Sequence, residues 1–285
     1  TGIISTIAGA TSPLIASITG NATLAYIDHA NIYICHNNYL KKINLNTNSV
    51  AIIAGNGVLG YSGDGGPATN AAISMSVYNR MCKDVSGDIY ISDDINKCIR
   101  KIKASTNIIS TFLNPSNAPF MDTPYGLCFD GSGNLYIGDY ASHIVLKANT
   151  TTSVTSIFAG LYGSPGYTGD GGLATNARFD HPFDIKFDNG NLYICDDANN
   201  CIRQVDPSGI MTSFINTGLN TPRGFCFDGF GNTYISNNLK IIKRNSTGIL
   251  NVIAGNSQQL FSGDGSLSTN ASINNPKKLA RDING

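Results

Sequence analysis

One short block of residues occurs five times along the chain, and this repeat constrains the fold more than any other feature. Each copy is an Asn or Asp, one further residue, and then Tyr-Ile, at positions 31–34, 88–91, 134–137, 191–194 and 232–235. An alternating apolar run precedes each copy, and glycine turns such as Gly131 to Gly133 and Asn189-Gly190 join the two segments. Alternating apolar residues on both sides of a glycine turn predict a tight β-hairpin, because glycine tolerates the positive φ of such turns.

Two further strands are expected after each hairpin. A third strand is indicated at residues 97–102, 201–205 and 239–243, and a fourth at 108–112, 153–158 and 248–253. No segment shows the helical period, which excludes a solenoid of helices. Four short strands in every repeat are typical of propeller blades, so the sequence predicts an all-β propeller of four-stranded antiparallel blades.

The repeated segments resemble the NHL repeat family. The resemblance rests on the Tyr-Ile-x-Asp-Asp, Ile-Arg and Ile-x-x-Ile-Ala-Gly segments and on a Tyr-Ser/Thr-Gly-Asp-Gly-Gly loop. That loop lies at residues 60–69, returns at 166–175, and recurs in weaker form at 261–266. The resemblance covers nearly the whole chain, so we expect a single domain over residues 1–285. It also implies that the strands of each blade run in the order a to d from the central axis outwards.

The spacing of the repeats predicts six blades. Successive copies are separated by 57 (31 to 88), 46 (88 to 134), 57 (134 to 191) and 41 (191 to 232) residues, so long and short repeats alternate. Three such pairs give a six-bladed β-propeller whose last blade is incomplete in this chain. Its strand a comes from the C-terminus, near Leu279 to Ile283, and its strand d comes from the N-terminus, near Ile3 to Ile7. Either the chain is a segment of a longer protein, or a neighbouring chain exchanges a strand into this blade.

Charge and composition exclude several classes of partner. The chain has 19 basic and 19 acidic residues, and this net charge of zero argues against nucleic acid or an anionic membrane as partner. No apolar run reaches the length of a membrane span, so we expect no membrane insertion. Seven cysteines lack metal-site spacing, although a disulfide between Cys195 and Cys201 across a hairpin is left open. Sequons at Asn21, Asn149, Asn245 and Asn270 leave the compartment unknown and slightly favour an extracellular one.

The residues that begin each strand a form a predicted ring at the mouth of the central channel. Three cations and two aromatic rings in this ring would suit an anionic or sugar-like ligand, through hydrogen bonds and stacking. The alternative interpretation is an ordinary water-filled rim. In chain order the ring consists of Thr23, Arg80, Tyr125, Phe183, Arg223 and Lys277.

The glycine-rich loops carry one aspartate each, at Asp64, Asp170 and Asp264. We expect them on the same face as the turns that contain Asp93-Asp94, Asp139, Asp196-Asp197 and Asn237-Asn238. Carboxylate oxygens of this kind could hold calcium, which prefers oxygen ligands. The structural alternative is favoured, because a loop repeated at one blade position is better explained by backbone geometry and Asx-turns. No cofactor other than calcium is suggested.

The sequence favours a non-catalytic scaffold that binds a protein or glycan partner through its loop face. The alternative is a metal-dependent lyase or lactonase-type hydrolase with its site in the central channel, since some NHL-like and six-bladed propellers are such enzymes. The four histidines, His29, His36, His143 and His181, lie at unlike positions of different blades, so they cannot all meet at one ion. No Ser-His-Asp set is present, so no catalytic residue is predicted.

Overall fold

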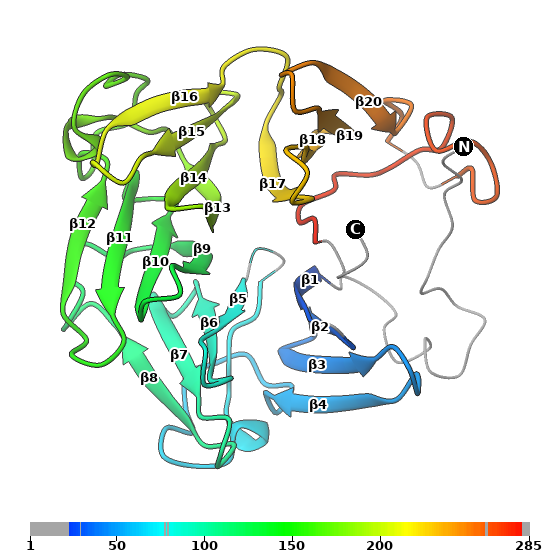
Figure 1. The fold of residues 1–285 in the computed structure, drawn as a ribbon. Helices are drawn as coiled ribbons and strands as arrows, with labels where there is room; N and C mark the ends of the chain where they lie inside the picture. The colour runs from blue at the N-terminus through cyan, green and yellow to red at the C-terminus, as the bar shows by residue number, and fades with distance from the viewer. Residues whose placement is uncertain (1–22, 29, 77, 79, 260–261, 281–285) are drawn as a thin grey trace.

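The computed structural model describes residues 23–280, apart from residues 29, 77, 79, 260 and 261. Within them, five four-stranded antiparallel sheets follow one another around a central axis, each in the sequence order of its strands. Figure 1 shows the first strand of every sheet nearest the centre and the fourth at the periphery. We call the sheets blades 1 to 5. The blade architecture predicted from the repeats is therefore confirmed.

The two inner strands of each blade are the hairpins predicted from the Tyr-Ile blocks. Each inner pair is antiparallel, and its register places the Tyr-Ile block opposite the preceding apolar run. The inner pairs are β1 (Thr23–Ile27) with β2 (Asn31–His36), β5 (Met81–Lys83) with β6 (Ile89–Asp93), β9 (Pro124–Phe129) with β10 (Asn134–Asp139), β13 (Pro182–Asp188) with β14 (Asn191–Asp196), and β17 (Pro222–Phe227) with β18 (Thr233–Asn237).

The two outer strands complete each blade, and short 3-10 turns at Ala68–Asn70 and Ala174–Asn176 follow the long glycine loops. The outer pairs are β3 (Tyr39–Asn44) with β4 (Val50–Ala54), β7 (Cys98–Ile102) with β8 (Ile109–Leu113), β11 (Ile144–Asn149) with β12 (Thr155–Ala159), β15 (Cys201–Val205) with β16 (Met211–Ile215), and β19 (Lys240–Arg244) with β20 (Leu250–Ala254).

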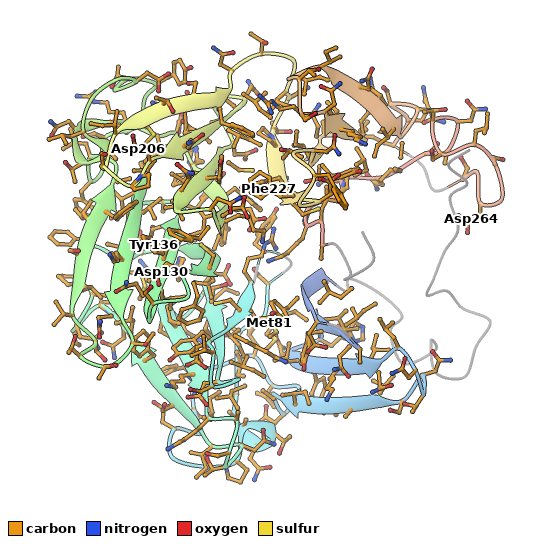
Figure 2. The ribbon with its side chains drawn as sticks, viewed as in Figure 1. Met81, Asp130, Tyr136, Asp206, Phe227 and Asp264 are labelled. Carbon is orange, nitrogen blue, oxygen red and sulfur yellow. The ribbon has the colours of Figure 1, made fainter. Side chains whose placement is uncertain are left out.

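Glycines and aspartates together set the inner turns. Gly131 and Gly133 have φ of 77° and 86°, a region that other residues adopt only with strain. The carboxylate of Asp130 accepts hydrogen bonds from the backbone nitrogens of Ser132 at 2.7 Å and Asn134 at 3.2 Å. This Asx-turn fixes the hairpin that the sequence predicted. Asp130 and Asp206, which caps the turn before β16, are labelled in Figure 2.

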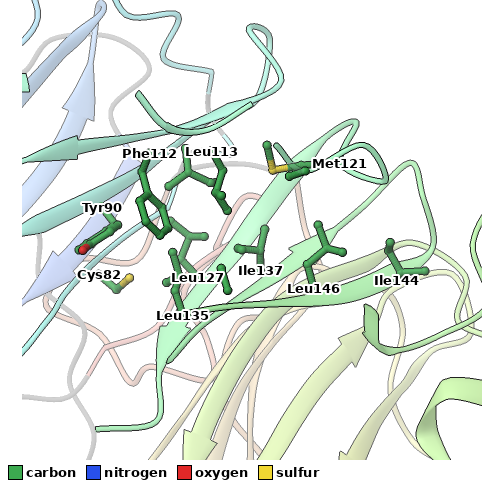
Figure 3. Packing of buried hydrophobic residues seen from close by; sticks show 13 residues of the cluster. Cys82, Tyr90, Phe112, Leu113, Met121, Leu127, Leu135, Ile137, Ile144 and Leu146 are labelled. Atoms are coloured by element: carbon green, nitrogen blue, oxygen red, sulfur yellow. The ribbon is translucent and has the colours of Figure 1, made fainter. Parts of the chain in front are cut away.

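The hydrophobic core lies between neighbouring blades, because successive sheets pack face to face. One cluster joins Tyr90 and Phe112 of blade 2 to Leu127, Leu135 and Ile137 of blade 3 (Figure 3). The Tyr of the Tyr-Ile block therefore contributes to packing between blades, since the Tyr90 ring meets Phe129 of blade 3 edge-on with centroids 5.1 Å apart. Such aromatic pairs add to the stabilisation that burial alone provides.

Glycines in two innermost strands let the next segment approach closely. A Cβ placed on Gly126 of β9 would lie 2.8 Å from the carbonyl oxygen of Phe183, in the next blade. A Cβ on Gly224 of β17 would lie 2.2 Å from the carbonyl oxygen of Lys277. The segment around Lys277 thus lies against β17 in the way that β13 lies against β9.

The predicted strand d of the incomplete blade, Ile3 to Ile7, lies outside the described residues, and of its strand a only residues up to 280 are described, without strand assignment. The disulfide left open between Cys195 and Cys201 is absent from the structure, in which both side chains are buried thiols. Cys195 is paired with Ile202 and Cys201 with Asp196, so the two thiols lie on opposite faces of the sheet.

Candidate functional site

The predicted ring residues meet at one end of the channel. Phe183 is central to them, with the guanidinium groups of Arg80 and Arg223 at 5.3 Å and 5.5 Å from its ring centroid. Tyr125 packs against Phe183 with a centroid distance of 5.2 Å. The ammonium of Lys277 lies 4.3 Å from the centroid of Tyr78. The side chain of Thr23 lies outside the described residues.

Sequence alignment on strand a missed Tyr78 and Tyr140, which complete this aromatic group. Both rings pack against Tyr125, with centroid distances of 5.2 Å for Tyr78 and 5.0 Å for Tyr140. Neither residue begins a strand, since Tyr78 precedes β5 and Tyr140 follows β10. Burial raises the pKa of the Tyr125 phenol above its ordinary value.

The three ring cations differ in accessibility. Arg80 is 0% exposed and contacts Asp184, with Nε 3.9 Å from a carboxylate oxygen. Arg223 is partly exposed, and its Nε lies 3.5 Å from Asp197. Lys277 is partly exposed as well, and burial together with the charge of Arg223 lowers the pKa of its ammonium. Arg223 and Lys277 are therefore the cations that a ligand at the mouth can reach, and ligand binding by the ring stays a prediction.

A cavity of about 400 Å³ occupies the other end of the channel, where the innermost strands finish. Three lysines line it, Lys83, Lys186 and Lys278, together with Asp188 and the surrounding apolar side chains. Burial and the nearby charge of Lys186 together lower the pKa of Lys278 to about 7. Sequence reasoning missed this cavity, because it concentrated on the residues that begin each inner strand.

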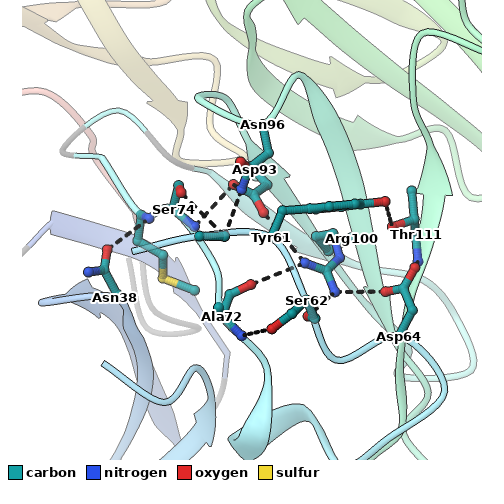
Figure 4. Close-up of polar contacts among 12 residues, drawn as sticks. Asn38, Tyr61, Ser62, Asp64, Ala72, Ser74, Asp93, Asn96, Arg100 and Thr111 are labelled. Carbon is teal, nitrogen blue, oxygen red and sulfur yellow. Dashed lines mark hydrogen bonds and ion pairs between the residues drawn. The ribbon is translucent and has the colours of Figure 1, made fainter. Parts of the chain in front are cut away.

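The glycine-rich loops fasten one blade to the next. Asp64, in the loop after blade 1, accepts a hydrogen bond from Arg100 Nη2 of blade 2 at 2.7 Å and from the backbone nitrogen of Thr111 at 3.0 Å (Figure 4). Asp170 likewise accepts from Arg203 Nη2 at 2.6 Å and from the hydroxyl of Ser213 at 2.6 Å. Protein donors thus engage both carboxylate oxygens of each aspartate, as the structural interpretation expects.

The third loop has the same backbone form, since Gly263 has φ of 92° and its Cβ would lie 2.6 Å from Ala271. The matching distances for Gly63 and Gly169 are 2.7 Å and 2.6 Å, to Ala71 and Ala177. Asp264, in the third loop, is labelled in Figure 2. Calcium binding by Asp64, Asp170 and Asp264 stays an untested prediction.

In blades 2 to 5, the residue that ends the second strand holds the segment leading into the first strand of the same blade. Asp93, Asp139, Asp196 and Asn237 all accept a hydrogen bond from a backbone nitrogen of that segment, over 2.6–3.2 Å. Burial raises the pKa of Asp93 to about 6 and that of Asp196 to about 7, despite hydrogen bonds from Asn96 and Asn199. These carboxyl groups, considered as ion ligands from the sequence, serve here as internal caps.

Two of the four histidines, His143 and His181, contact each other, and their positions in the sequence did not predict this contact. His143 follows β10 and His181 precedes β13, 38 positions later, yet their ring centroids are 4.8 Å apart. Both contact Asp180, whose Oδ1 lies 2.8 Å from His181 Nδ1 and 3.6 Å from His143 Nδ1. Burial and the neighbouring His181 lower the pKa of His143. No signal in the one-dimensional sequence links the two positions, because the contact forms only between adjacent blades.

Radial four-stranded sheets, Tyr-Ile hairpins and repeated Gly-Asp-Gly loops define an NHL-type β-propeller. The chain belongs to the Teneurin NHL domain family, which it matches over residues 17–218. No curated protein matches the chain. Within the described residues, no helix combines the length and apolar character needed to cross a membrane.

Several solved structures share the fold at low sequence identity. A protein of unknown function from Bacteroides thetaiotaomicron is 16% identical, with a TM-score of 0.61 over 91% of this chain and 64% of that one. An auxiliary nutrient binding protein from the same organism is 14% identical, with a TM-score of 0.62 over 92% and 64%. Virginiamycin B lyase from Staphylococcus aureus is 14% identical, with a TM-score of 0.55 over 82% and 70%. The chain thus spans just under two thirds of the length of the two Bacteroides proteins.

A Nidogen/Laminin complex also contains a similar propeller, 14% identical, with a TM-score of 0.56 over 79% of this chain and 75% of that one. At this level of identity each likeness concerns the fold alone. Binding proteins and a lyase are both present among these structures, so the function has to be argued from this chain's own surface.

Proposed function

We propose that this propeller is a non-catalytic module that binds a protein or glycan partner through its loop face. The observation that carries the proposal is the position of the exposed aromatic side chains. Of the five exposed aromatics among the described residues, Tyr61, Phe120, Tyr162 and Tyr167 lie in loops that join one blade to the next. Phe230, in a turn at the other end of the sheets, is the fifth. Tyrosine and phenylalanine supply large contact area at binding surfaces at low entropic cost.

The same face carries aliphatic side chains and the two accessible channel-mouth cations. Val58, Leu59 and Leu161 are exposed in the same inter-blade loops as Tyr61 and Tyr162, and Phe120 packs on Tyr162 with ring centroids 5.4 Å apart. Apolar side chains that gather in this way on a surface favour an interaction site. Arg223 and Lys277 at the centre of the face add positive charge for an anionic or carbohydrate group of the partner.

The alternative of a lyase or lactonase-type hydrolase has less support from the channel mouth. The five ring residues that converge there, Arg80, Tyr125, Phe183, Arg223 and Lys277, offer neither an imidazole nor a carboxylate to a metal ion within the channel. The role as a rigid binding scaffold needs no chemistry at that position.

We further propose that the ring has a sixth position and that residues 276–280 occupy its innermost strand. Lys277 lies against Gly224 as Phe183 lies against Gly126, and the Ser236 hydroxyl donates to the Lys277 carbonyl oxygen at 3.3 Å. The sequence assigns the outermost strand of that position to residues 3–7, which lie outside the described residues, and leaves its two middle strands to a longer chain or to strand exchange from a neighbouring chain.

Paired surface variants test the binding face. The double variant Phe120→Ser/Tyr162→Ser removes the aromatic pair from the loop face, and Val85→Ser/Phe230→Ser removes exposed apolar side chains from the opposite turns. The wild-type protein and both variants would be applied to a glycan array and to an array of purified extracellular proteins. We expect the loop-face variant to lose the binding that the wild type shows, while the opposite-face variant keeps it. Loss in the opposite-face variant alone would contradict the proposal.

A further inference from the structure

Three side chains with metal-ligand atoms meet where blade 3 contacts blade 4, beside the channel mouth. They are His143, Asp180 and His181, and their ligand atoms all lie within 4.8 Å of one another. The His143 side chain is only 12% exposed, whereas Asp180 and His181 are about one third exposed. We propose that this cluster binds a divalent transition-metal ion, with zinc as the best match to two imidazoles and one carboxylate.

The other blade junctions show what the fold itself requires at these positions. At the junction of blades 4 and 5, Asn200 Oδ1 accepts a hydrogen bond of 2.8 Å from the backbone nitrogen of Thr221. At the junction of blades 3 and 4, His143 Nδ1 accepts the equivalent hydrogen bond from His181 at 3.2 Å. An asparagine therefore satisfies the junction, and the two imidazoles exceed its structural needs.

The junction of blades 2 and 3 is also completed without an imidazole. Asp122 matches Asp180 in position, since both donate a backbone nitrogen to the carboxylate that ends the second strand of their blade. Asp122 is paired with Lys97, the residue that matches His143, and Thr123 follows it. An ion pair of one cation and one carboxylate completes that junction, so the second imidazole, His181, distinguishes the cluster from it.

The contacts within the cluster place two acceptors face to face. Because His143 Nδ1 accepts the backbone hydrogen bond, this nitrogen carries a lone pair, and Asp180 Oδ1 lies 3.6 Å from it. The same oxygen lies 2.8 Å from His181 Nδ1, so one carboxylate oxygen faces the Nδ1 atoms of both imidazoles. An ion between these three atoms would replace the hydrogen bond that the His181 backbone nitrogen donates to His143 Nδ1. It would be coordinated by the Nδ1 atoms of His143 and His181 and by Asp180 Oδ1.

The surroundings of the cluster also favour a cation. Tyr140 packs on the His181 ring with centroids 4.2 Å apart, which fixes the orientation of the imidazole. Asp197, only 4% exposed, donates its backbone nitrogen to the His181 carbonyl oxygen at 3.2 Å. Its carboxylate oxygen Oδ1 has no hydrogen-bond donor within the described part of the chain. With three protein ligands, the ion would keep one position for water or for a donor group of a bound partner.

The test uses a variant that copies a junction the fold already contains. His143→Asn/Asp180→Asn/His181→Thr gives the junction of blades 3 and 4 the residues Asn200, Asn220 and Thr221 of the next junction. Chelator-stripped wild-type protein and this variant would be titrated with zinc chloride by calorimetry. Cobalt(II) absorption would report whether thiolates take part in binding, and Cys226→Ser would control for the one cysteine that is not fully buried.

We expect the wild type and Cys226→Ser to bind one zinc ion each, and the triple variant to lose that binding while it melts, without metal, at the temperature of the wild type. Added zinc should raise the melting temperature of the wild type and leave that of the triple variant unchanged, since only ions that bind the folded state stabilise it. Absence of zinc, cobalt or nickel binding in the wild type would overturn the proposal. Equal binding by the triple variant, or a thiolate spectrum with cobalt, would also overturn it.

Discussion

Replacement of Arg203 by isoleucine tests whether the loop aspartates fasten the blades together. The guanidinium is almost fully buried, and its Nη2 donates to Asp170 Oδ1 at 2.6 Å and to the Thr168 carbonyl oxygen at 3.1 Å. Nη1 lies 3.7 Å from the carboxylate of Asp196, which is fully buried. Its loss leaves a buried carboxyl group and a carbonyl group without their charged partner. Breaking such a buried pair costs about 3–5 kcal/mol, and we expect Arg203→Ile to lower the free energy of unfolding by that amount.

Blade 5 supplies the matched control. Ile242 stands at the register position of Arg203, and Asn237 stands at that of Asp196. The double variant Arg203→Ile/Asp196→Asn therefore gives blade 4 a pair that blade 5 already tolerates. We expect it to recover about 1–3 kcal/mol of the loss, because the unpaired buried carboxyl group is gone.

Equilibrium unfolding in urea at pH 7 measures these differences. The chain has no tryptophan and 13 tyrosines, so circular dichroism and tyrosine fluorescence are the appropriate signals. Coincident transitions by both signals would justify a two-state analysis. A loss below about 1 kcal/mol for Arg203→Ile, or a further loss on adding Asp196→Asn, would refute the clamp as described.

Three further predictions follow from burial and close contacts. Burial holds the folded-state pKa of Asp93 near 6 and that of Asp196 near 7, whereas an unfolded aspartate titrates near about 3.9. Between the unfolded and the folded pKa values, the folded protein binds more protons than the unfolded chain, so the urea midpoint should fall as pH rises from about 5 to 7. A midpoint that does not change with pH would contradict this, and Asp196→Asn should reduce the pH dependence. Gly224→Ala should destabilise the protein by about 1–3 kcal/mol, since its methyl group would meet the Lys277 carbonyl oxygen; a neutral effect in thermal melting would count against that contact. Ellman's reagent should modify no more than one thiol of the native protein, Cys226, and all seven after unfolding; rapid reaction of several native thiols would show that the blades are less tightly packed.

The hairpins could be predicted from sequence because their determinants are local. A glycine turn such as Gly131 to Gly133 and the alternation on either side of it specify the strand pair within about 12 residues. The repeat of the loop around Asp64 and Asp170 likewise indicated a structural role, and the hydrogen bonds from Arg100 and Arg203 agree with that role.

Contacts between blades could not be predicted in the same way. His143 and His181 belong to adjacent blades, and their approach depends on how two sheets stack. The choice of strand-a starts as the channel ring found Phe183 and Arg223 but missed Tyr78, which enters the same cluster from a loop. Cys195 failed as a disulfide partner because the strand register, offset by a single residue, places it on the opposite face from Cys201.

The central claim is that each blade runs outwards from a buried innermost strand to an exposed outermost one. Hydrogen exchange followed by mass spectrometry tests it directly, since protection follows burial and local stability. Peptides from β9 and β13, whose residues are mostly buried, should exchange slowly. Peptides from β4, β12 and β20, in which at most one side chain is buried, should exchange fastest. The account predicts that this gradient recurs in every blade. Equal protection of outer and inner strands, or fast exchange in β9 and β13, would contradict it.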